Sequence, residues 1–468
     1  MPGRALGQEY RHLLILESRD WFAEHRPQFD PARDLVLTYD FGLKLEIEAL
    51  GGQALFVDHL ADKQVMQAEG QDIFAYRGVP FGFAFRIEIW NDLVFHVRTR
   101  VCLERLRELK FETLFVGTHL GLVENALSDM GLSYSQVALG ASRHAGYYFP
   151  IHRWMDERLR TRTFRHRLRD FYTAIHGTLI SWVDRVSCGH KKPGVFIQEY
   201  YPTRQIVQQL KQDRHLRVML VHYSWAPGWR KYLTERPIPV WGRARKFQGV
   251  SDDLMRAFRE RRHARLILAN GTDISGNVYD IIVQRVSSRI ADTIRTLDCV
   301  IHHMDRNPIC LEILIANIGL VATLVDCVAK SRRVPSYLII NGMLGGGYLD
   351  EGKYATYINA YSTSIKEHYF RGINNVVCLG DPRMDAYIQH NPQRVVNRNV
   401  PTITIGASGH STIDLNSYLA VEFDFMYDVL QAIHTLKKRG VHLRVIIKVR
   451  ANSYRQQYES FVDEYFPG

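Results

Sequence analysis

Residues 35–58, LVLTYDFGLKLEIEALGGQALFVD, indicate the fold class. An apolar run ends at Tyr39-Asp40, residues of helical period extend from Gly42 to Ala49, and a second apolar run ends at Asp58. Gly51-Gly52 separates the helical part from the second run, and glycine is the usual residue where a helix ends. Parallel strands need a crossover connection, most often a helix. The stretch therefore predicts a β-α-β unit.

The same alternation recurs along the whole chain. Short runs rich in β-branched and aromatic residues, each followed by a helical stretch, predict parallel sheets flanked by helices. We expect strands at His12–Leu16, Leu35–Tyr39, Ala54–Val57, Thr113–Val116, Gly194–Ile197, Arg217–Val221, Arg265–Leu268, Cys299–Ile301, Tyr337–Ile340, Val376–Leu379, Thr402–Ile405 and Leu443–Ile447. These are too many strands for one ordinary sheet.

The length of 468 residues predicts at least two domains. A polar, Pro-containing stretch at Asn391–Arg394 marks a boundary. We expect a Rossmann-like, doubly wound domain over residues 1–395, with a helical, basic insertion at about 140–185, and the start of a second such domain over 396–468. Only two strands and two helices fit after Pro401, so the second domain is expected to be incomplete.

Composition limits the class of protein. With 46% hydrophobic, 11% aromatic and 23% charged residues the chain is typical of globular domains. Six cysteines without C-x-x-C spacing argue against a zinc site or a disulfide framework. The start of the sequence lacks a secretory pattern and no apolar run is long enough to span a bilayer, so we expect a cytoplasmic protein. No G-x-S-x-G, H-E-x-x-H or Walker lysine motif is present.

The formal net charge of +11 predicts an anionic partner. No RRM, KH or helix-turn-helix signature accompanies it, which argues against nucleic acid. The densest basic stretch, residues 153–169, reads RWMDERLRTRTFRHRLR. It is compatible with an amphipathic helix at the inner face of an anionic membrane. It is equally compatible with a solvated helix that turns Trp154, Phe164 and Leu168 to the core.

Loops after the expected strands are the places to search for a site, because ligands of open α/β sheets bind beyond the carboxyl ends of the strands. In the loop 341–348, Asn341, Gly345 and Gly346 would let backbone amides approach a phosphate, or would simply form a flexible turn. In the loop 380–385, Arg383 could pair with a phosphate, or the loop could only join two domains.

Two further loops carry phosphate-binding residue types. Gly409, His410 and Ser411 precede an expected helix near Leu415, where amides and an imidazole suit a diphosphate, although a capped turn would look the same. Lys448 and Arg450 alternate after a strand and so point to one side of an extended chain.

General-base candidates are His303 and Asp305, in a loop expected after Cys299–Ile301, and Asp40, at the end of the first strand of the β-α-β unit. Helix capping is the alternative role for Asp305. Thr118 and Glu199 hold comparable positions after strands but lack a partner that the sequence identifies.

The order of these features resembles the interdomain region of GT-B glycosyltransferases that build bacterial capsules and teichoic-acid-like polymers, including the CDP-glycerol glycerophosphotransferases. Gly380, Pro382, Arg383 and Asp385 match a G-x-P-R-x-D pattern that precedes the C-terminal domain in that family, and Lys448 with Asn452 looks like a later K-x-x-x-N segment. Where many of those enzymes carry His-Gly, this chain has Asn341-Gly342. The resemblance covers roughly the last third of the chain.

The resemblance implies a GT-B-like transferase. It would take a nucleotide-activated glycosyl or polyol-phosphate donor as substrate, with no resident cofactor or metal, and transfer the group to a surface polysaccharide or a lipid-linked precursor. The family's donor-binding segment would fall beyond Gly468. A nucleotide-sugar 2-epimerase-like isomerase and a non-catalytic scaffold of a polysaccharide-assembly complex remain as alternatives.

Overall fold

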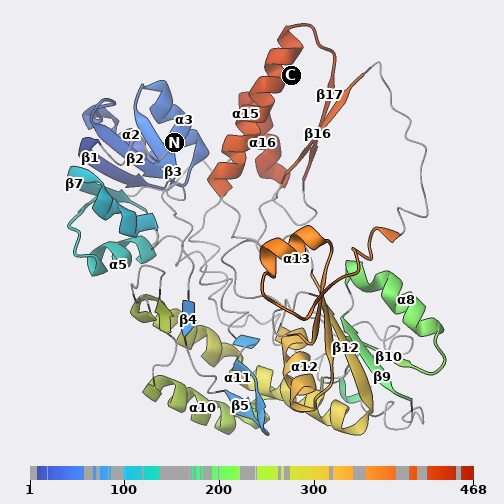
Figure 1. Cartoon of the computed structure of the whole chain (residues 1–468). Coiled ribbons are helices and arrows are strands. Elements are labelled where there is room, and N and C mark those ends of the chain that lie inside the picture. The colour runs from blue at the N-terminus through green and yellow to red at the C-terminus, as the bar shows by residue number, and fades with distance from the viewer. Residues whose placement is uncertain are drawn as a thin grey trace.

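The computed structural model describes residues 8–17, 19–56, 67–69, 74–82, 84–85, 100, 102–118, 121–137, 168, 171, 175, 177–179, 182, 192–198, 200–221, 238, 240–261, 265–267, 273, 275–315, 320–340, 355–385, 400–407, 419–449 and 455–467. Within them it is an α/β protein whose larger sheets are parallel and flanked by helices, compatible with a Rossmann-like fold (Figure 1).

The first sheet has five strands in the order β3-β2-β1-β7-β8. Its elements are β1 (Glu9–Leu16), α2 (Arg19–His25), η1 (Arg26–Gln28), β2 (Asp34–Thr38), α3 (Phe41–Ala49), β3 (Gln53–Phe56), η3 (Arg105–Glu108), β7 (Lys110–Gly117), α5 (Gly121–Asp129) and β8 (Ser135–Gln136). β2, α3 and β3 are the β-α-β unit predicted from residues 35–58, and β2 and β3 pair in parallel as expected. The chain turns from one side of β1 to the other when it enters β7, so the order reverses between these two strands.

Alternate residues of the first sheet face two different helical layers. Leu14 and Val36 pack with Trp21 and Phe22 of α2 and with Leu43 of α3. Their neighbours along the strands, such as Leu13 and Leu35, pack instead with α5. Burial on both faces explains why these strands read as continuous apolar runs rather than as alternating ones.

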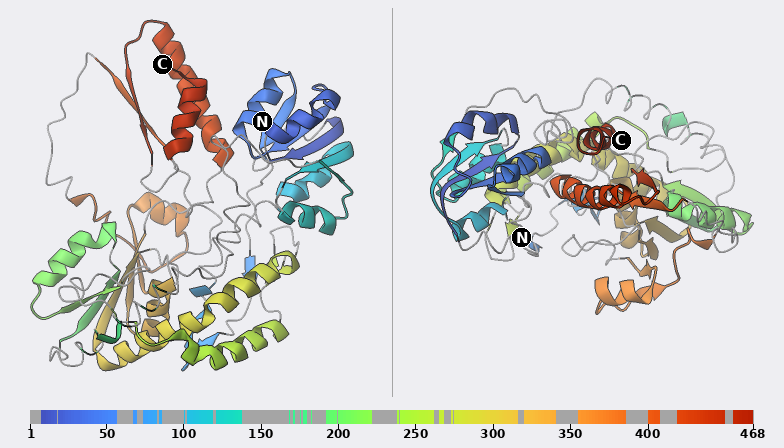
Figure 2. Two further views of the ribbon diagram at one scale, coloured as in Figure 1. Left: turned by 180° about the vertical axis from the view of Figure 1, so that it is seen from behind. Right: turned by 90° about the horizontal axis from the view of Figure 1, so that it is seen from above.

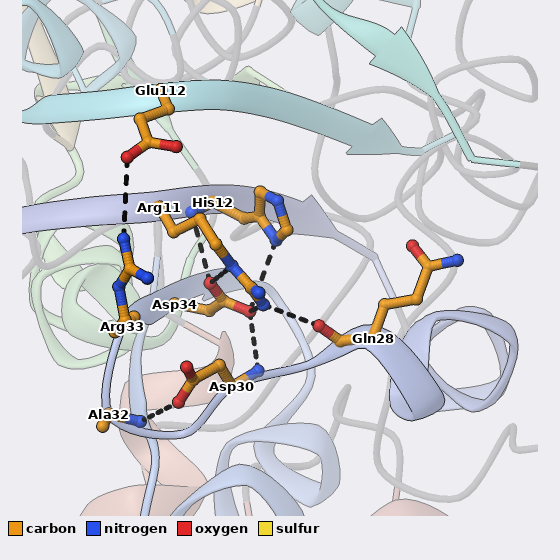
Figure 3. A network of polar contacts seen from close by, with 8 residues as sticks. All are labelled: Arg11, His12, Gln28, Asp30, Ala32, Arg33, Asp34 and Glu112. Atoms are coloured by element: carbon orange, nitrogen blue, oxygen red, sulfur yellow. Dashed lines mark hydrogen bonds and ion pairs between the residues drawn. The ribbon is translucent and has the colours of Figure 1, made fainter.

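Asp34 fixes the amino edge of the first sheet (Figure 3). Its buried carboxylate accepts hydrogen bonds from the Arg11 side chain at 3.0 Å, from the backbone of His12 at 3.2 Å and from the backbone of Asp30 at 2.7 Å. These contacts join β1, β2 and the turn before β2.

The second sheet has six parallel strands in the order β10-β9-β12-β13-β14-β15. Its elements are β9 (Gly194–Gln198), η4 (Tyr201–Thr203), α8 (Arg204–Gln212), β10 (Arg217–Val221), η5 (Ala244–Phe247), α10 (Gln248–Arg261), α11 (Ser275–Arg306), β12 (Ile309–Ile315), α12 (Leu320–Ser331), β13 (Ser336–Ile339), β14 (Tyr357–Ala360), α13 (Thr363–Tyr369) and β15 (Val376–Cys378). Residues 1–395, which we expected to form one Rossmann-like domain, therefore contain two separate parallel sheets. The order of the second sheet reverses between β9 and β12.

The expected strand Cys299–Ile301 is wrong, because these residues lie inside the long helix α11. Val286, Ile290, Ile294, Leu297 and Ile301 recur every three or four residues and are all buried against the second sheet. That period is helical. A short apolar window around Cys299 does not reveal it.

Two strands of the second sheet were not predicted. β12 (Ile309–Ile315) carries a charged residue, Glu312, in an otherwise apolar run. β14 (Tyr357–Ala360) was not among the expected strands, and a short helix, α13 (Thr363–Tyr369), follows it. Both strands are internal to the sheet, so pairing on both sides stabilises the extended backbone where the local sequence does not favour it.

A third unit follows the expected boundary. β16 (Thr402–Gly406), α15 (Leu419–Lys438), β17 (Arg444–Lys448) and α16 (Arg455–Tyr465) supply the two strands and two helices predicted after Pro401. β16 and β17 pair in parallel. Figures 1 and 2 show this unit beside the first sheet.

Phe41, at the start of α3, joins the first sheet to the third unit. Its ring lies 5.4 Å from that of Phe461 and 5.6 Å from that of Tyr427. Two ion pairs flank it, Lys44 with Asp424 at 3.1 Å and Arg19 with Glu464 at 3.3 Å. The end of the described chain thus packs on its beginning.

Two small antiparallel pairs complete the described structure. β5 (Ala75–Tyr76) pairs with β6 (Val79–Pro80), and β4 (Gln67–Glu69) pairs with β11 (Arg265–Ile267). β11 confirms a strand expected at Arg265–Leu268 but belongs to neither parallel sheet. Among the helices in the described part of the chain, none is long and apolar enough to cross a bilayer.

Candidate functional site

The carboxyl edge of β13, β14 and β15 brings together two of the loops selected from the sequence. β14 pairs in parallel with β13 on one side and with β15 on the other. In the sequence, Asn341 comes two residues after β13, and Gly380 comes two residues after β15. Both segments therefore start from the same edge of the sheet, on either side of β14. This is the carboxyl edge, where ligands of open α/β sheets bind.

Asn359 holds the Gly380 turn against β14. Its buried side-chain amide donates to the carbonyl of Gly380 at 2.9 Å and accepts from the backbone N–H of Leu379 at 3.0 Å. Gly380 has a φ of +82°, a conformation that glycine adopts without strain. The turn is thus fixed on the sheet by side-chain and backbone contacts together.

Asp381 and Arg383 form an ion pair within this turn. Nε of Arg383 donates to both oxygens of Asp381, at 2.9 and 2.8 Å, and Nη2 donates to Oδ2 at 2.6 Å. The Arg383 guanidinium also lies 5.4 Å from the ring centre of Tyr361, within reach of a cation–π contact. Arg383 is therefore oriented from two sides.

The electrostatics of the turn follow from these contacts. Burial alone would raise the pKa of Asp381, but the hydrogen bonds and charge of Arg383 outweigh burial and hold this pKa below its usual value. Burial raises the pKa of Tyr361 to about 12, against the lowering effect of Arg383. The Tyr361 hydroxyl donates to the carbonyl of Ile340, the last described residue before the glycine-rich loop.

This arrangement can bind an anion. A guanidinium held in a fixed orientation offers planar, directional donors to phosphate or carboxylate oxygens. Asp381 competes for the same donors, so it both orients Arg383 and limits its affinity for an anion. Asn341, Gly345 and Gly346 lie outside the described residues, so their part in the edge stays a prediction.

Lys448 and Gly406 place the last two selected loops side by side. They are register partners at the carboxyl ends of β17 and β16. The N–H of Ala407 donates to the carbonyl of Lys448 at 3.1 Å. The Lys448 side chain is exposed at the carboxyl end of β17, next to the end of β16, from which the chain continues to Gly409, His410 and Ser411. Those three residues and Arg450 lie outside the described residues.

His303 and Asp305 are not in a loop after a strand, as we expected, but in the last turns of α11. His303 is 5% exposed, and its Nε2 lies 3.4 Å from the sulfur of Met219 in the core. Asp305 pairs with Arg332 at 2.8 Å. Because α11 ends just before β12 begins, both residues lie at the amino edge of the sheet, away from the edge that carries Arg383.

Asp40 lies after β2 as predicted, but its carboxylate is 1% exposed and caps α3. It accepts from the backbone of Gly42 at 2.8 Å and of Arg19 at 3.3 Å. Burial raises its pKa, opposed by the charge of Arg19 and by these backbone donors. The geometry supports a structural role as a helix cap.

The first sheet has a polar pair that sequence reasoning identified only in part. Thr118, at the end of β7, donates from its hydroxyl to the buried carboxylate of Glu17 at 3.0 Å. Glu17 follows β1, so the pair lies where the strand order of the first sheet reverses. A carboxylate directly after an apolar strand was the available signal. In the second sheet, a hydrogen bond joins the two strands at the corresponding point, because the Gln198 side chain accepts from the backbone of Ile315 at 2.9 Å.

Among the described residues, no group of three or more His, Cys, Asp or Glu side chains could hold a metal ion. Comparison of the sequence with protein-family models found no match, and comparison with curated proteins found no significant similarity.

Proposed function

We propose that this chain binds a nucleotide-activated donor and transfers a glycosyl or polyol-phosphate group from it to a surface polysaccharide or its lipid-linked precursor. A GT-B-like arrangement of the domains is part of the proposal. The donor is consumed as a substrate and no resident cofactor is needed.

The common edge of β13, β14 and β15 carries the proposal. It unites the G-x-P-R-x-D turn with the start of a glycine-rich loop, and it presents a guanidinium that Asp381 and Tyr361 orient. Anionic groups of a nucleotide donor are the ligands that such a guanidinium recognises.

Arg383 and Lys448 are the two described cations that we assign to phosphate binding. Each lies at the carboxyl end of a parallel strand, since Arg383 is in the turn after β15 and Lys448 is the last residue of β17. In transfer from a nucleotide donor, cations near the leaving phosphate stabilise the negative charge that develops on it. We do not assign the general base to His303 or Asp305, because their places at the amino edge and in the core keep them from this phosphate.

Thermal melting in the presence of CMP, CDP, UDP and GDP tests the proposal. A nucleotide that binds only the folded chain raises the melting midpoint. We expect a rise with at least one nucleoside phosphate and a smaller rise for Arg383→Gln and for Lys448→Gln. Lys437→Gln, an exposed lysine on α15 of the same unit, is the matched control and should respond like the unchanged chain.

Incubation with a labelled donor then separates transfer from isomerisation. Label that enters a polymer or lipid-linked acceptor supports the transferase, whereas a donor sugar altered without any acceptor would point to an isomerase. A chain that no nucleotide stabilises would contradict the proposal. If a nucleotide stabilised Arg383→Gln and Lys448→Gln as much as the control Lys437→Gln, the assignment of Arg383 and Lys448 to phosphate binding would be contradicted.

A further inference from the structure

Five large apolar side chains are exposed on helical residues between 168 and 182. Leu168 is 60% exposed, Phe171 56%, Ile175 48%, Leu179 59% and Trp182 65%. At about 100° per residue, these positions fall within an arc of about 80° on a helix. We call this set the apolar stripe. It excludes the interpretation in which Leu168 points to the core.

The opposite side of these helical residues is attached to the protein. Gly177 is buried, and a Cβ at this position would overlap the carbonyl oxygen of Val240. The backbone of Trp241 in turn donates to Sγ of Cys299 in α11 at 3.3 Å. Position 177 is two residues after position 175, or about 200° around the helix, and position 175 lies at the centre of the apolar stripe, so position 177 is roughly opposite the stripe. The contact at Gly177 therefore holds the stripe outward.

The sequence around the apolar stripe is strongly basic. Residues 153–192 contain ten Lys and Arg against four Asp and Glu, a net charge of +6 within a chain of +11. An apolar arc that includes aromatic residues, together with basic neighbours, fits the interface of an anionic bilayer, where rings lie at the headgroup level and cations contact lipid phosphates.

A second copy of the chain fits the apolar stripe less well. A two-fold symmetric contact would bring residues 153–192 of one copy against the same residues of the other. The net positive charges would then repel each other, whereas anionic lipid neutralises them.

We propose that the apolar stripe docks the chain on the surface of an anionic lipid bilayer. The apolar stripe contains neither Arg383 nor Lys448, so lipid docking does not depend on the proposed transferase activity. Docking would bring the enzyme to a lipid-linked acceptor.

Co-sedimentation of the full chain with vesicles tests the docking. We expect binding to vesicles of phosphatidylcholine mixed with phosphatidylglycerol, and weaker binding in high salt or with phosphatidylcholine alone. Phe171→Ser should weaken binding about tenfold, because it removes the apolar area of one aromatic ring from the contact with lipid. Leu179→Ser should reproduce the loss, and Trp182→Phe should largely preserve binding.

Phe425→Ser is the matched control. Phe425 lies on α15 and is 55% exposed, close to the 56% of Phe171, but outside the apolar stripe. It should bind vesicles as the unchanged chain does. Binding that Phe171→Ser and Leu179→Ser leave intact, or equal binding to neutral and anionic vesicles, would overturn the proposal. So would a dimer in solution that Phe171→Ser dissociates. Nucleotides should raise the melting midpoint of all these variants as they do that of the unchanged chain, so that a loss of vesicle binding is separate from a loss of donor binding.

Discussion

Arg383 lies over the Tyr361 ring while Nε and Nη2 of Arg383 hold the Asp381 carboxylate at 2.6–2.9 Å. The cation that we assign to phosphate binding is thus already partnered in the absence of a ligand. A phosphate must share the guanidinium with Asp381, so the pair affects both the stability of the turn and its affinity for anions.

Arg383→Gln should lower the free energy of unfolding by about 1 kcal/mol at neutral pH, because it leaves the half-buried Asp381 without its partner. The pKa of Asp381 lies below its ordinary 3.8 in the folded chain. The stabilisation is therefore present above that ordinary value and is lost as the pH falls through the folded-state pKa. Urea unfolding of both chains should show a difference at neutral pH that disappears in acid. Arg371→Gln, at an exposed arginine, is the control and should show no such difference.

Glu312→Gln should stabilise the chain at pH values above the folded-state pKa of Glu312. Glu312 on β12 and Asp326 on α12 are both buried, and neither Glu312 oxygen has a hydrogen-bond partner. Burial, and then the charge of Asp326, raise the pKa of Glu312 well above 4.5. Stability is therefore highest while the group is protonated and falls as the pH rises from the ordinary value through the folded-state pKa.

Urea unfolding over a range of pH measures this effect. We expect Glu312→Gln to remove much of the decrease in unfolding free energy that accompanies rising pH. The effect is on the order of 1 kcal/mol or more, since each unit of pKa shift corresponds to about 1.4 kcal/mol. Glu367→Gln, at an exposed glutamate on α13, should leave the pH profile unchanged. If the unfolding free energy of Glu312→Gln fell with rising pH as much as that of the unchanged chain, the explanation would be refuted.

Phe41→Ala should loosen the third unit from the first sheet. The Phe41 ring is 1% exposed and contacts Phe461, Tyr427 and Tyr465. Truncating a buried phenylalanine costs about 3–5 kcal/mol. Hydrogen exchange of the α15 amides should become faster, and the melting midpoint should fall. Phe425→Ala removes an exposed ring from α15 and should change neither; equal effects of the two variants would mean that Phe41 has no special role.

Gly177→Ala and Gly249→Ala should change stability in opposite directions, although both replace a glycine in a helix. A Cβ at Gly177 would overlap the Val240 carbonyl, whereas nothing lies within 4 Å of a Cβ at Gly249 of α10. Alanine stabilises an unobstructed helical position by about 0.5–1 kcal/mol relative to glycine. Thermal melting should show a lower midpoint for Gly177→Ala and a higher one for Gly249→Ala. Two shifts of the same sign would contradict the contact at Val240.

The sequence predicted most strands of the parallel sheets, but it did not reveal all the strands that pair with them. The unit from β2 to β3 was predictable because its glycines and apolar runs are local signals. β12 was missed because Glu312 interrupts its apolar run, and Cys299–Ile301 was mistaken for a strand because the helical period of α11 is visible only over a longer window.

The candidate site was predictable in the same partial way. The position of Arg383 after a strand identified it as a cation at a carboxyl edge. Its partner Tyr361 was not predicted, because Tyr361 follows β14, a strand that the local sequence did not reveal. His303 and Asp305 were selected because they follow an expected strand, Cys299–Ile301, which is part of helix α11.

Local sequence signals were enough to predict the α/β class, the β-α-β unit at residues 35–58, the two strands and two helices after Pro401, and the basic character of residues 153–192. These depend on residue type and on periods of a few residues, which local backbone geometry translates into helices and strands. Four features became visible in the three-dimensional fold: residues 1–395 contain two sheets, Tyr361 faces Arg383, Glu312 is buried and the apolar stripe is exposed. Those features depend on pairing and burial between segments far apart in the chain, and no local pattern encodes which segments meet.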